Sequence, residues 1–164
     1  MFSAAFKQFM TLSAAAAVNT KAIFGYGYTG SSSSITNLVS NTGVVAADTS
    51  GVGTARSSLA AAGYGGDKAI FGYGVSGSTH YSLTNKVSNT GVVASNTSGV
   101  GQARIGVAAA GYGVDTAIFG YGENTDVGTA NFSITNLVSN TGVVAGNTTG
   151  VGTGRRRLAA ASYG

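Results

Sequence analysis

One six-residue phrase, Ala-Ile-Phe-Gly-Tyr-Gly, occurs three times in this chain, at 22–27, 69–74 and 117–122. Each copy is followed by a Thr-Asn pair, a Ser-Asn-Thr-Gly-Val-Val run, a Gly-Val-Gly stretch, an arginine and a small-residue segment. Internal repeats with a period of roughly 20 to 50 residues indicate a solenoid, a propeller or an array of like units. The predicted organisation is an N-terminal arm, 1–20, followed by one repeat domain, 21–164, with repeats at about 21–67, 68–115 and 116–164.

The spacing within the repeat is constant except in one place. Nineteen residues separate Asn37 from Arg56, and the second and third repeats keep the same spacing between the equivalent residues. The segment from the repeat phenylalanine to that asparagine is 13, 14 and then 17 residues long. The pattern predicts a rigid framework with one loop per repeat that is free to vary, which is where repeat proteins tend to place binding functions.

The composition excludes several classes of protein. The 164 residues can form one domain with a core, and the absence of cysteine excludes a disulfide framework and a thiolate metal site. Only 9% of the residues are charged, against roughly 25% in ordinary soluble domains, which favours a protein that hides much of its surface in an assembly. The net charge of +4 is concentrated at Arg155–Arg157, where a solvated patch is favoured over a phosphate or acidic contact. We predict no nucleic-acid partner and no membrane span.

The N-terminal arm has the pattern of an amphipathic helix. Its larger apolar residues recur at helical spacing, and alanines that favour helix surround them. The four residues of this apolar stripe are Phe2, Phe6, Phe9 and Met10. Docking onto another structural protein through residues 1–18 and packing against the chain's own domain both remain open.

Beyond Thr20 the sequence favours short strands. The Ala-Ile-Phe segment is aromatic and β-branched and is bounded by glycine, and 34–39 alternates polar with apolar residues. Asn41 and Gly43 form a turn signal before a return strand at Val44–Ala46, and a further strand is expected at 56–62. Each repeat is therefore predicted to contain four short strands joined by tight turns.

The repeat resembles the kelch motif, a four-stranded blade of a β-propeller. In that motif an arginine precedes a small or apolar strand, a glycine turn and an aromatic strand that ends in a glycine pair, and 56–74 and 104–122 follow this order. Here Tyr73 separates the glycine pair, and Val92 stands near the place of the late-blade tryptophan. The resemblance covers about 21–164 and implies an all-β fold. The repeats are also similar to glycine-rich repeats of phage and environmental-virus structural proteins.

Three blades are fewer than the usual count of about four to eight in a propeller. The first repeat lacks the small-residue strand before its aromatic strand, and the last repeat ends with a small-residue strand that has no aromatic strand after it. These complementary strands predict a homo-oligomer in which blades are completed between chains, since open edges favour association. A two-chain ring of six blades is preferred; three chains would give nine blades. A filament and a compact three-bladed prism remain open.

Residues that could support catalysis are few. His80 is the only histidine, so no histidine cluster can form within a chain. The five carboxylates are Asp48, Asp67, Asp115, Glu123 and Asp126. Asp67 and Asp115 occupy equivalent turns and are expected to hydrogen-bond there, and Asp48 is aligned with Ser95 and Gly146. A calcium site at Glu123 and Asp126 fits no known loop spacing. We predict no enzyme activity, no cofactor and no metal.

The residues that vary between repeats are the candidates for recognition, because aromatic and polar side chains on loops suit glycan or protein surfaces. These candidates are Tyr28, His80, Tyr81, Glu123, Asn124, Asp126 and Phe132. Three Asn-X-Ser/Thr sequons occur at Asn96, Asn131 and Asn147. They carry meaning only in a glycosylating compartment.

The favoured function is a non-enzymatic structural or assembly protein, a virion surface or tail component, with a virion or extracellular location. The alternative is a glycan- or receptor-binding module, an adhesin or lectin that uses the variable loops. A designed repeat protein is a third hypothesis, and the unrepeated arm argues against it.

Overall fold

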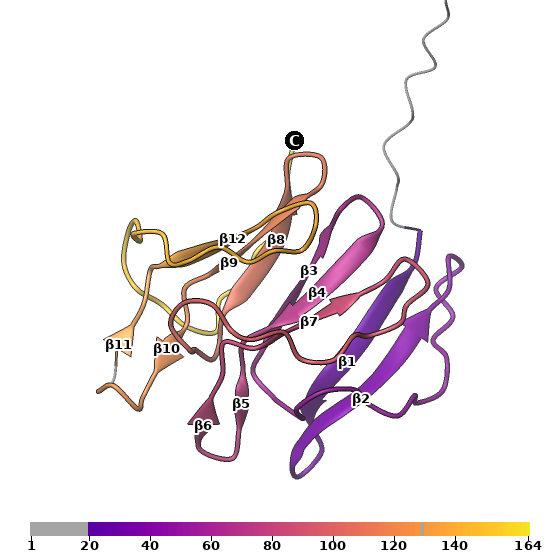
Figure 1. Cartoon of the computed structure of the whole chain (residues 1–164), viewed down its shortest axis with the longest axis horizontal. Coiled ribbons are helices and arrows are strands. Elements are labelled where there is room, and N and C mark those ends of the chain that lie inside the picture. The colour runs from indigo at the N-terminus through magenta and orange to yellow at the C-terminus, as the bar shows by residue number, and fades with distance from the viewer. Residues whose placement is uncertain (1–19, 129) are drawn as a thin grey trace, which may run out of the picture.

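The fold was taken from a computed structural model that describes residues 20–128 and 130–164. All regular structure among these residues is β-strand, which confirms the predicted all-β class (Figure 1). The helix predicted for the N-terminal arm lies outside the described residues. No described helix is long and apolar enough to cross a membrane.

The larger strands form three antiparallel sheets that lie side by side in chain order (Figure 1), and the second and third sheets each take their first strand from the end of the preceding repeat. The first sheet is the hairpin of β1 (Ala22–Tyr28) and β2 (Ser32–Val39). The second has the order β3-β4-β7, with β3 at Ala60–Tyr64, β4 at Lys68–Gly72 and β7 at Thr84–Val87. The third has the order β8-β9-β12, with β8 at Ala108–Tyr112, β9 at Thr116–Gly120 and β12 at Thr135–Val138. The second and third sheets are therefore built alike.

The segment of variable length forms a small hairpin in the second and third repeats. β5 (Val75–Ser76) pairs with β6 (Thr79–His80), and β10 (Glu123–Asn124) pairs with β11 (Ala130–Asn131). In the first repeat the same segment is part of the long β1–β2 hairpin. The prediction of one variable loop per repeat is thus confirmed as a family of hairpins of different length.

The tyrosine of each Phe-Gly-Tyr-Gly phrase interrupts its strand. Tyr26, Tyr73 and Tyr121 have φ angles of 64°, 68° and 63°, in the left-handed region that a tyrosine seldom adopts. β4 and β9 end one residue before this tyrosine, and β1 passes it with a β-bulge. The same strained conformation at three equivalent positions indicates that each tyrosine ring is held in place by its surroundings.

The predicted fourth strand of each repeat is only partly formed. In the second repeat it consists of two isolated bridges, Val87↔Val93 and Thr84↔Thr97. Val93 and Thr97 are four residues apart, whereas their partners Val87 and Thr84 are three residues apart. The pairing therefore contains a bulge and is not a continuous ladder. The prediction of four regular strands is therefore wrong in this detail, because the irregular register interrupts the ladder.

The core lies between neighbouring sheets. Side chains alternate across β4, so that Ile70 packs toward the third sheet and Phe71 toward the first. Ala62 of β3 is buried in the cluster between the second and third sheets, with Ala109 of β8 packed against that cluster. The short alanines allow β3 and β8 to approach closely, so that a Cβ on Gly111 would lie 3.4 Å from the carbonyl oxygen of Gly63.

Replacement of Gly99 by alanine should destabilise the fold by about 1–3 kcal/mol, because a Cβ there would lie 2.5 Å from the carbonyl carbon of Ser82. Gly146 is the matched control, because a Cβ at that position would meet nothing within 4 Å. Urea unfolding monitored by circular dichroism measures both variants. Equal stability of Gly99→Ala and Gly146→Ala would contradict the tight approach of the Gly-Val-Gly segment to the sheet.

Candidate functional site: joints between repeats and the two open edges

A buried arginine connects each repeat to the next. The Nη2 of Arg56 donates a hydrogen bond of 2.6 Å to Oδ1 of Asn85 in the second repeat, and its guanidinium lies 5.0 Å from the centre of the Tyr26 ring. Arg104 makes the same contacts one repeat later, at 2.7 Å to Asn136 and 4.6 Å from the Tyr73 ring. We call this arrangement of arginine, tyrosine and next-repeat asparagine the Arg–Tyr–Asn joint.

Both joint arginines are completely buried. Desolvation lowers the pKa of Arg56 and Arg104, and the facing tyrosines oppose that shift. The ordinary pKa of arginine is so high that both remain charged. Nε and Nη1 of each guanidinium have no hydrogen-bond partner in the described part of the chain, so the ring face and the asparagine oxygen are the groups that compensate for lost water.

The asparagine of the joint is itself held in position. Asn85 Nδ2 donates to the Ala94 carbonyl at 3.1 Å and to Oδ1 of Asn96 at 3.1 Å, which leaves its own Oδ1 directed at the arginine. The tyrosine is fixed as well, because its hydroxyl donates to a valine carbonyl of its own repeat, at 3.0 Å from Tyr26 to Val52. In the second joint, burial raises the pKa of Tyr73 to about 12, so the Tyr73 hydroxyl keeps its proton.

A side-chain hydrogen bond to the repeat asparagine shows which residues of the later repeats are equivalent to Asp48. Asp48 is eleven residues after Asn37 and accepts a hydrogen bond from its Nδ2 at 2.8 Å. Asn96 and Asn147 accept in the same way from Asn85 and Asn136, the asparagines of the first and second joints. The alignment of Asp48 with Ser95 and Gly146 was thus wrong by one residue. Two of the sequons are therefore parts of the framework: Asn96 accepts from the Thr54 amide at 3.1 Å, and Asn147 from the Gln102 amide at 3.2 Å.

Aromatic rings complete the packing between repeats. Tyr26 meets Phe71 edge to face at 5.1 Å between ring centres, and Tyr73 meets Phe119 at 5.2 Å. The phenylalanine of the second and third repeats is accordingly 3% and 0% exposed, whereas Phe24 of the first repeat is 61% exposed. The first repeat therefore leaves exposed the phenylalanine ring that the later repeats bury.

The last repeat has the complementary gap. Arg155 lies 4.7 Å from the Tyr121 ring, as in the other joints, but it is exposed and its side chain makes no hydrogen bond within 20–128 and 130–164. At the other edge, Oδ1 of Asn37 accepts no hydrogen bond from any described residue. Val151 is 82% exposed, while its equivalents Val52 and Val100 are 38% and 37% exposed. Each edge thus displays half of an Arg–Tyr–Asn joint.

The candidate recognition residues divide into two groups. Tyr28 is 71% exposed, and the loops that carry His80 and Asp126 touch through a contact of 2.7 Å between Nδ1 and Oδ2. Glu123 and Asn124 are each 3% exposed, since Glu123 pairs with Arg156 and Asn124 donates to a backbone carbonyl. Their side chains are therefore occupied inside the protein and are not at a loop tip.

The two remaining aromatic candidates, Tyr81 and Phe132, are half-buried. Their backbone carbonyls accept the amides of Arg104 and Arg155, at 3.4 Å and 3.3 Å. The docking candidates Phe2, Phe6, Phe9 and Met10 lie outside the described residues. No group of three metal-ligating side chains occurs among the residues that the structure describes.

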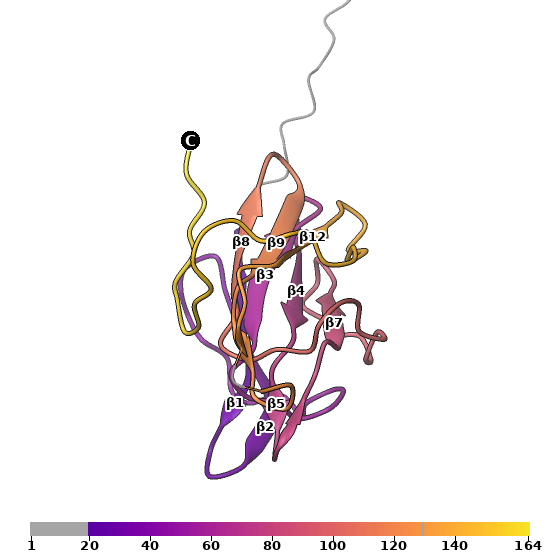
Figure 2. The ribbon, with the colours of Figure 1, turned by 90° about the vertical axis from the view of Figure 1, so that its left-hand side faces the viewer.

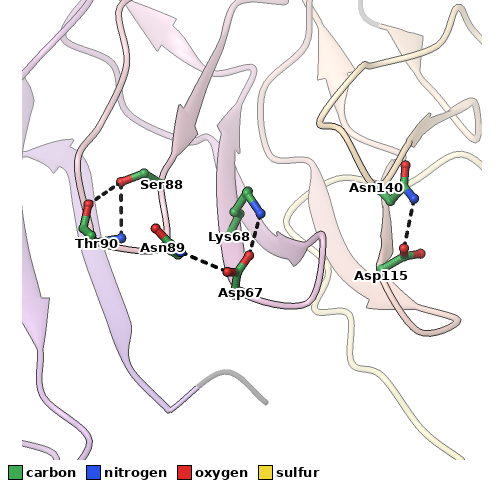
Figure 3. Close-up of polar contacts among 7 residues, drawn as sticks. All are labelled: Asp67, Lys68, Ser88, Asn89, Thr90, Asp115 and Asn140. Carbon is green, nitrogen blue, oxygen red and sulfur yellow. Dashed lines mark hydrogen bonds and ion pairs between the residues drawn. The ribbon is translucent and has the colours of Figure 1, made fainter. Parts of the chain in front are cut away.

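The turn aspartates hydrogen-bond within their own sheets (Figure 3). Asp67 accepts from Lys68 Nζ at 2.6 Å and from Asn89 Nδ2 at 3.1 Å, and Asp115 accepts from Asn140 at 3.0 Å. The bond from Lys68 is the main cause of the lowered pKa of Asp67. These contacts tie the turn between the first two strands of a sheet to the turn after its last strand.

Comparison with known proteins supports the fold and does not extend to function. No protein-family model matches the chain, and no curated protein matches it. Among solved structures, the chain is similar to that of YjhT. The TM-score is 0.55 at 14% identity, over 79% of this chain and 41% of that one. The chain thus spans less than half of that protein, and at this identity the likeness concerns the fold alone. The kelch resemblance stays a prediction.

Replacement of Asn85 by alanine should cost about 3 kcal/mol of stability, because it leaves the buried Arg56 without its acceptor. The matched control is Asn37→Ala, which loses the same local Nδ2 bonds but no arginine, and should cost about 1 kcal/mol. Urea unfolding at one low protein concentration compares them. Equal losses would show that the arginine bond contributes nothing of its own.

Proposed function

We propose that this chain is a non-enzymatic structural protein that assembles head-to-tail through its two open edges. The observation that carries the proposal is the split joint: Arg155 stacks on Tyr121 without an asparagine, and Asn37 offers an acceptor without an arginine. A second copy supplies each edge with the group that it lacks, in the arrangement that two joints within the chain already use.

An association of this kind is heterologous, because different surfaces of the two copies meet. Such contacts close into a ring or extend into a filament. Two chains would bring six repeats together, within the usual range of about four to eight propeller blades. We favour the two-chain ring, in keeping with the kelch resemblance.

The use of charge in the structure favours a scaffold over an enzyme. The most deeply buried charged groups serve structural contacts: Arg56 and Arg104 connect neighbouring repeats, and Glu123 pairs with Arg156 of its own repeat. Only 9% of the residues are charged, which suits a protein present in many copies in an assembly. A virion surface or tail component, outside the cell, is the setting that we propose.

One observation favours a second function, the binding of glycans or a receptor. The β5–β6 and β10–β11 hairpins extend from the same end of the molecule (Figure 1), and the His80–Asp126 contact joins the two loops. Asp126 remains 53% exposed in its side chain. Two linked polar loops on a rigid framework form a surface on which a sugar could be held.

The assembly proposal predicts a native mass of twice the 16.1 kDa of one chain, with a concentration-dependent return to the monomer. Arg155→Gln should weaken association at least tenfold, since a hydrogen bond to a charged group contributes about 1.5–3 kcal/mol. Arg157→Gln removes the same charge two residues away and should have little effect. Analytical ultracentrifugation measures all three proteins.

Two outcomes would refute assembly through the edges. One is a wild-type protein that stays monomeric at every concentration. The other is association that disappears on deletion of residues 1–18 while Arg155→Gln has no effect, because the arm and not the edges would then hold the chains together.

The second function predicts that a glycan array detects at least one sugar bound by the wild-type protein. Asp126→Ala should weaken that binding at least tenfold without changing the native mass, because the two loops lose the contact that joins them. Asp48→Ala is the control, since Asp48 lies at the first repeat's asparagine and away from the hairpin loops. Unchanged binding by Asp126→Ala would exclude these loops as the binding surface.

A further inference from the structure

The first sheet has an open groove where the other two sheets have a strand. β4 lies between β3 and β7, and β9 lies between β8 and β12, but among the described residues β1 pairs only with β2. Beside β1 is a groove of about 590 Å³, lined on one wall by Lys21–Ile23 and on the other by Ala61–Gly63 of β3. Asp67, Lys68 and Asn89, whose mutual contacts are drawn in Figure 3, also line this groove.

The segment 158–164 has the sequence of the strand that fills this place in the later sheets. Leu-Ala-Ala-Ala-Ser-Tyr-Gly at 158–164 is identical at six of seven positions to Leu-Ala-Ala-Ala-Gly-Tyr-Gly at 59–65, which contains β3. In the structure, however, 158–164 belongs to no sheet. It has a strand sequence and an unused backbone edge.

Within its own chain, 158–164 lies beside β8, in line with β3 and β8, the first strands of the second and third sheets. Ser162 Oγ donates to the Gly111 carbonyl of β8 at 2.6 Å, and the segment extends past β8 to the end of the chain (Figure 2). A Cβ on Gly111 would lie 3.4 Å from the carbonyl oxygen of Gly63 on β3 and 3.8 Å from Ser162 Oγ. β8 is thus bordered by β3 and by 158–164, so the segment is placed for pairing with a strand outside the chain.

Tyr163 is the side chain that would fill the groove. Its equivalent at the end of β3, Tyr64, is 4% exposed, and a Cβ on Gly142 would lie 2.7 Å from the Cζ of the Tyr64 ring. The first-joint equivalent of Gly142 is Gly91, which lies in the groove lining. Tyr163 is fully exposed. A Cβ on Gly91 would lie 2.5 Å from Leu38 Cδ2, so the half-exposed side chain of Leu38 borders the place that corresponds to the Tyr64 site over Gly142.

A smaller gap at the opposite end of β1 matches the start of the same segment. A Cβ on Gly74 would lie 3.0 Å from Leu59, and one on Gly122 would lie 2.8 Å from Val107. The equivalent glycine of the first repeat, Gly27, has nothing within 4 Å. Leu158 is the equivalent of Leu59 and Val107.

We infer that the groove beside β1 receives 158–164 of a second copy of this chain as an added antiparallel strand. The register copies that of β3 with β4, in which Ala60 faces Gly72 and Gly63 faces Ala69. It places Ala159 opposite Gly25 and Ser162 opposite Ala22 of the partner copy. Tyr163 then packs beside Gly91 against Leu38, and Leu158 packs over Gly27. The inference rests on the proposed head-to-tail assembly and specifies its strand, register and groove.

Cysteine cross-linking tests the register, and the chain is suited to it because it contains no cysteine. A Ser162→Cys chain is mixed with an Ala22→Cys chain and oxidised. Directly opposed residues of antiparallel strands lie within reach of a disulfide, so a cross-linked heterodimer should form. Ala69→Cys is the matched control for Ala22→Cys, because Ala69 already faces Gly63 within its own chain. It should yield at least tenfold less heterodimer with Ser162→Cys.

The outcomes separate this inference from the assembly on which it rests. A wild-type protein without self-association overturns both. An assembly of the expected mass whose Ala22→Cys and Ser162→Cys chains do not cross-link overturns the strand and register alone. Cross-linking that appears only after removal of residues 1–19 assigns the groove to the chain's own N-terminal segment and overturns the inference as well.

Discussion

The buried guanidinium between neighbouring repeats is the interaction on which the rest of the structure depends. Arg56 and Arg104 are stripped of water, which is costly for a charge unless a ring face and an oxygen replace the solvent. The replacement groups come from two different repeats, the tyrosine from the arginine's own repeat and the asparagine from the next one. One repeat alone therefore cannot satisfy its arginine. The repeats must therefore stack on one another for two reasons: to bury their small apolar core and to provide partners for the buried arginine.

The left-handed tyrosines follow from the same requirement. A positive φ at a non-glycine residue costs of the order of 1–3 kcal/mol, and the protein accepts it at all three copies. The conformation ends β4 and β9, puts a bulge into β1, and brings each ring under an arginine. There the tyrosine hydroxyl reaches a carbonyl of the Gly-Val-Gly stretch, at 3.2 Å from Tyr121 to Val151 in the last repeat. Glycine at this position would relieve the strain but would leave the guanidinium without a stacking partner. The tyrosine that splits the kelch-like glycine pair is thus explained by the joint.

The all-β class and the position of the one variable loop in each repeat could be predicted from the sequence, because repeat spacing and local propensity encode them. The joint could not, although its residues recur in every copy. Asn85 and Arg56 are 29 positions apart and belong to different repeats, so an alignment of copies places neither beside the other. The constant spacing of nineteen residues was the available signal. The misalignment of Asp48 by one residue was avoidable from the sequence, because Asp48, Asn96 and Asn147 each lie eleven residues after the asparagine of their repeat.

The contacts between repeats are of a nearest-neighbour kind, so an additional joint is energetically similar whether it lies within a chain or between two chains. A joint between two chains differs in that the chains lose translational and rotational entropy when they associate, a cost that a joint within one chain does not have. An edge arginine that stays hydrated carries no burial penalty in the monomer, whereas Arg56 and Arg104 cannot be exposed without separating sheets. The hydrated edge arginine, Arg155, therefore adds no burial penalty to a single chain. The open edges also retain, in Arg155 and Asn37, the two halves of a contact that the chain makes twice within itself.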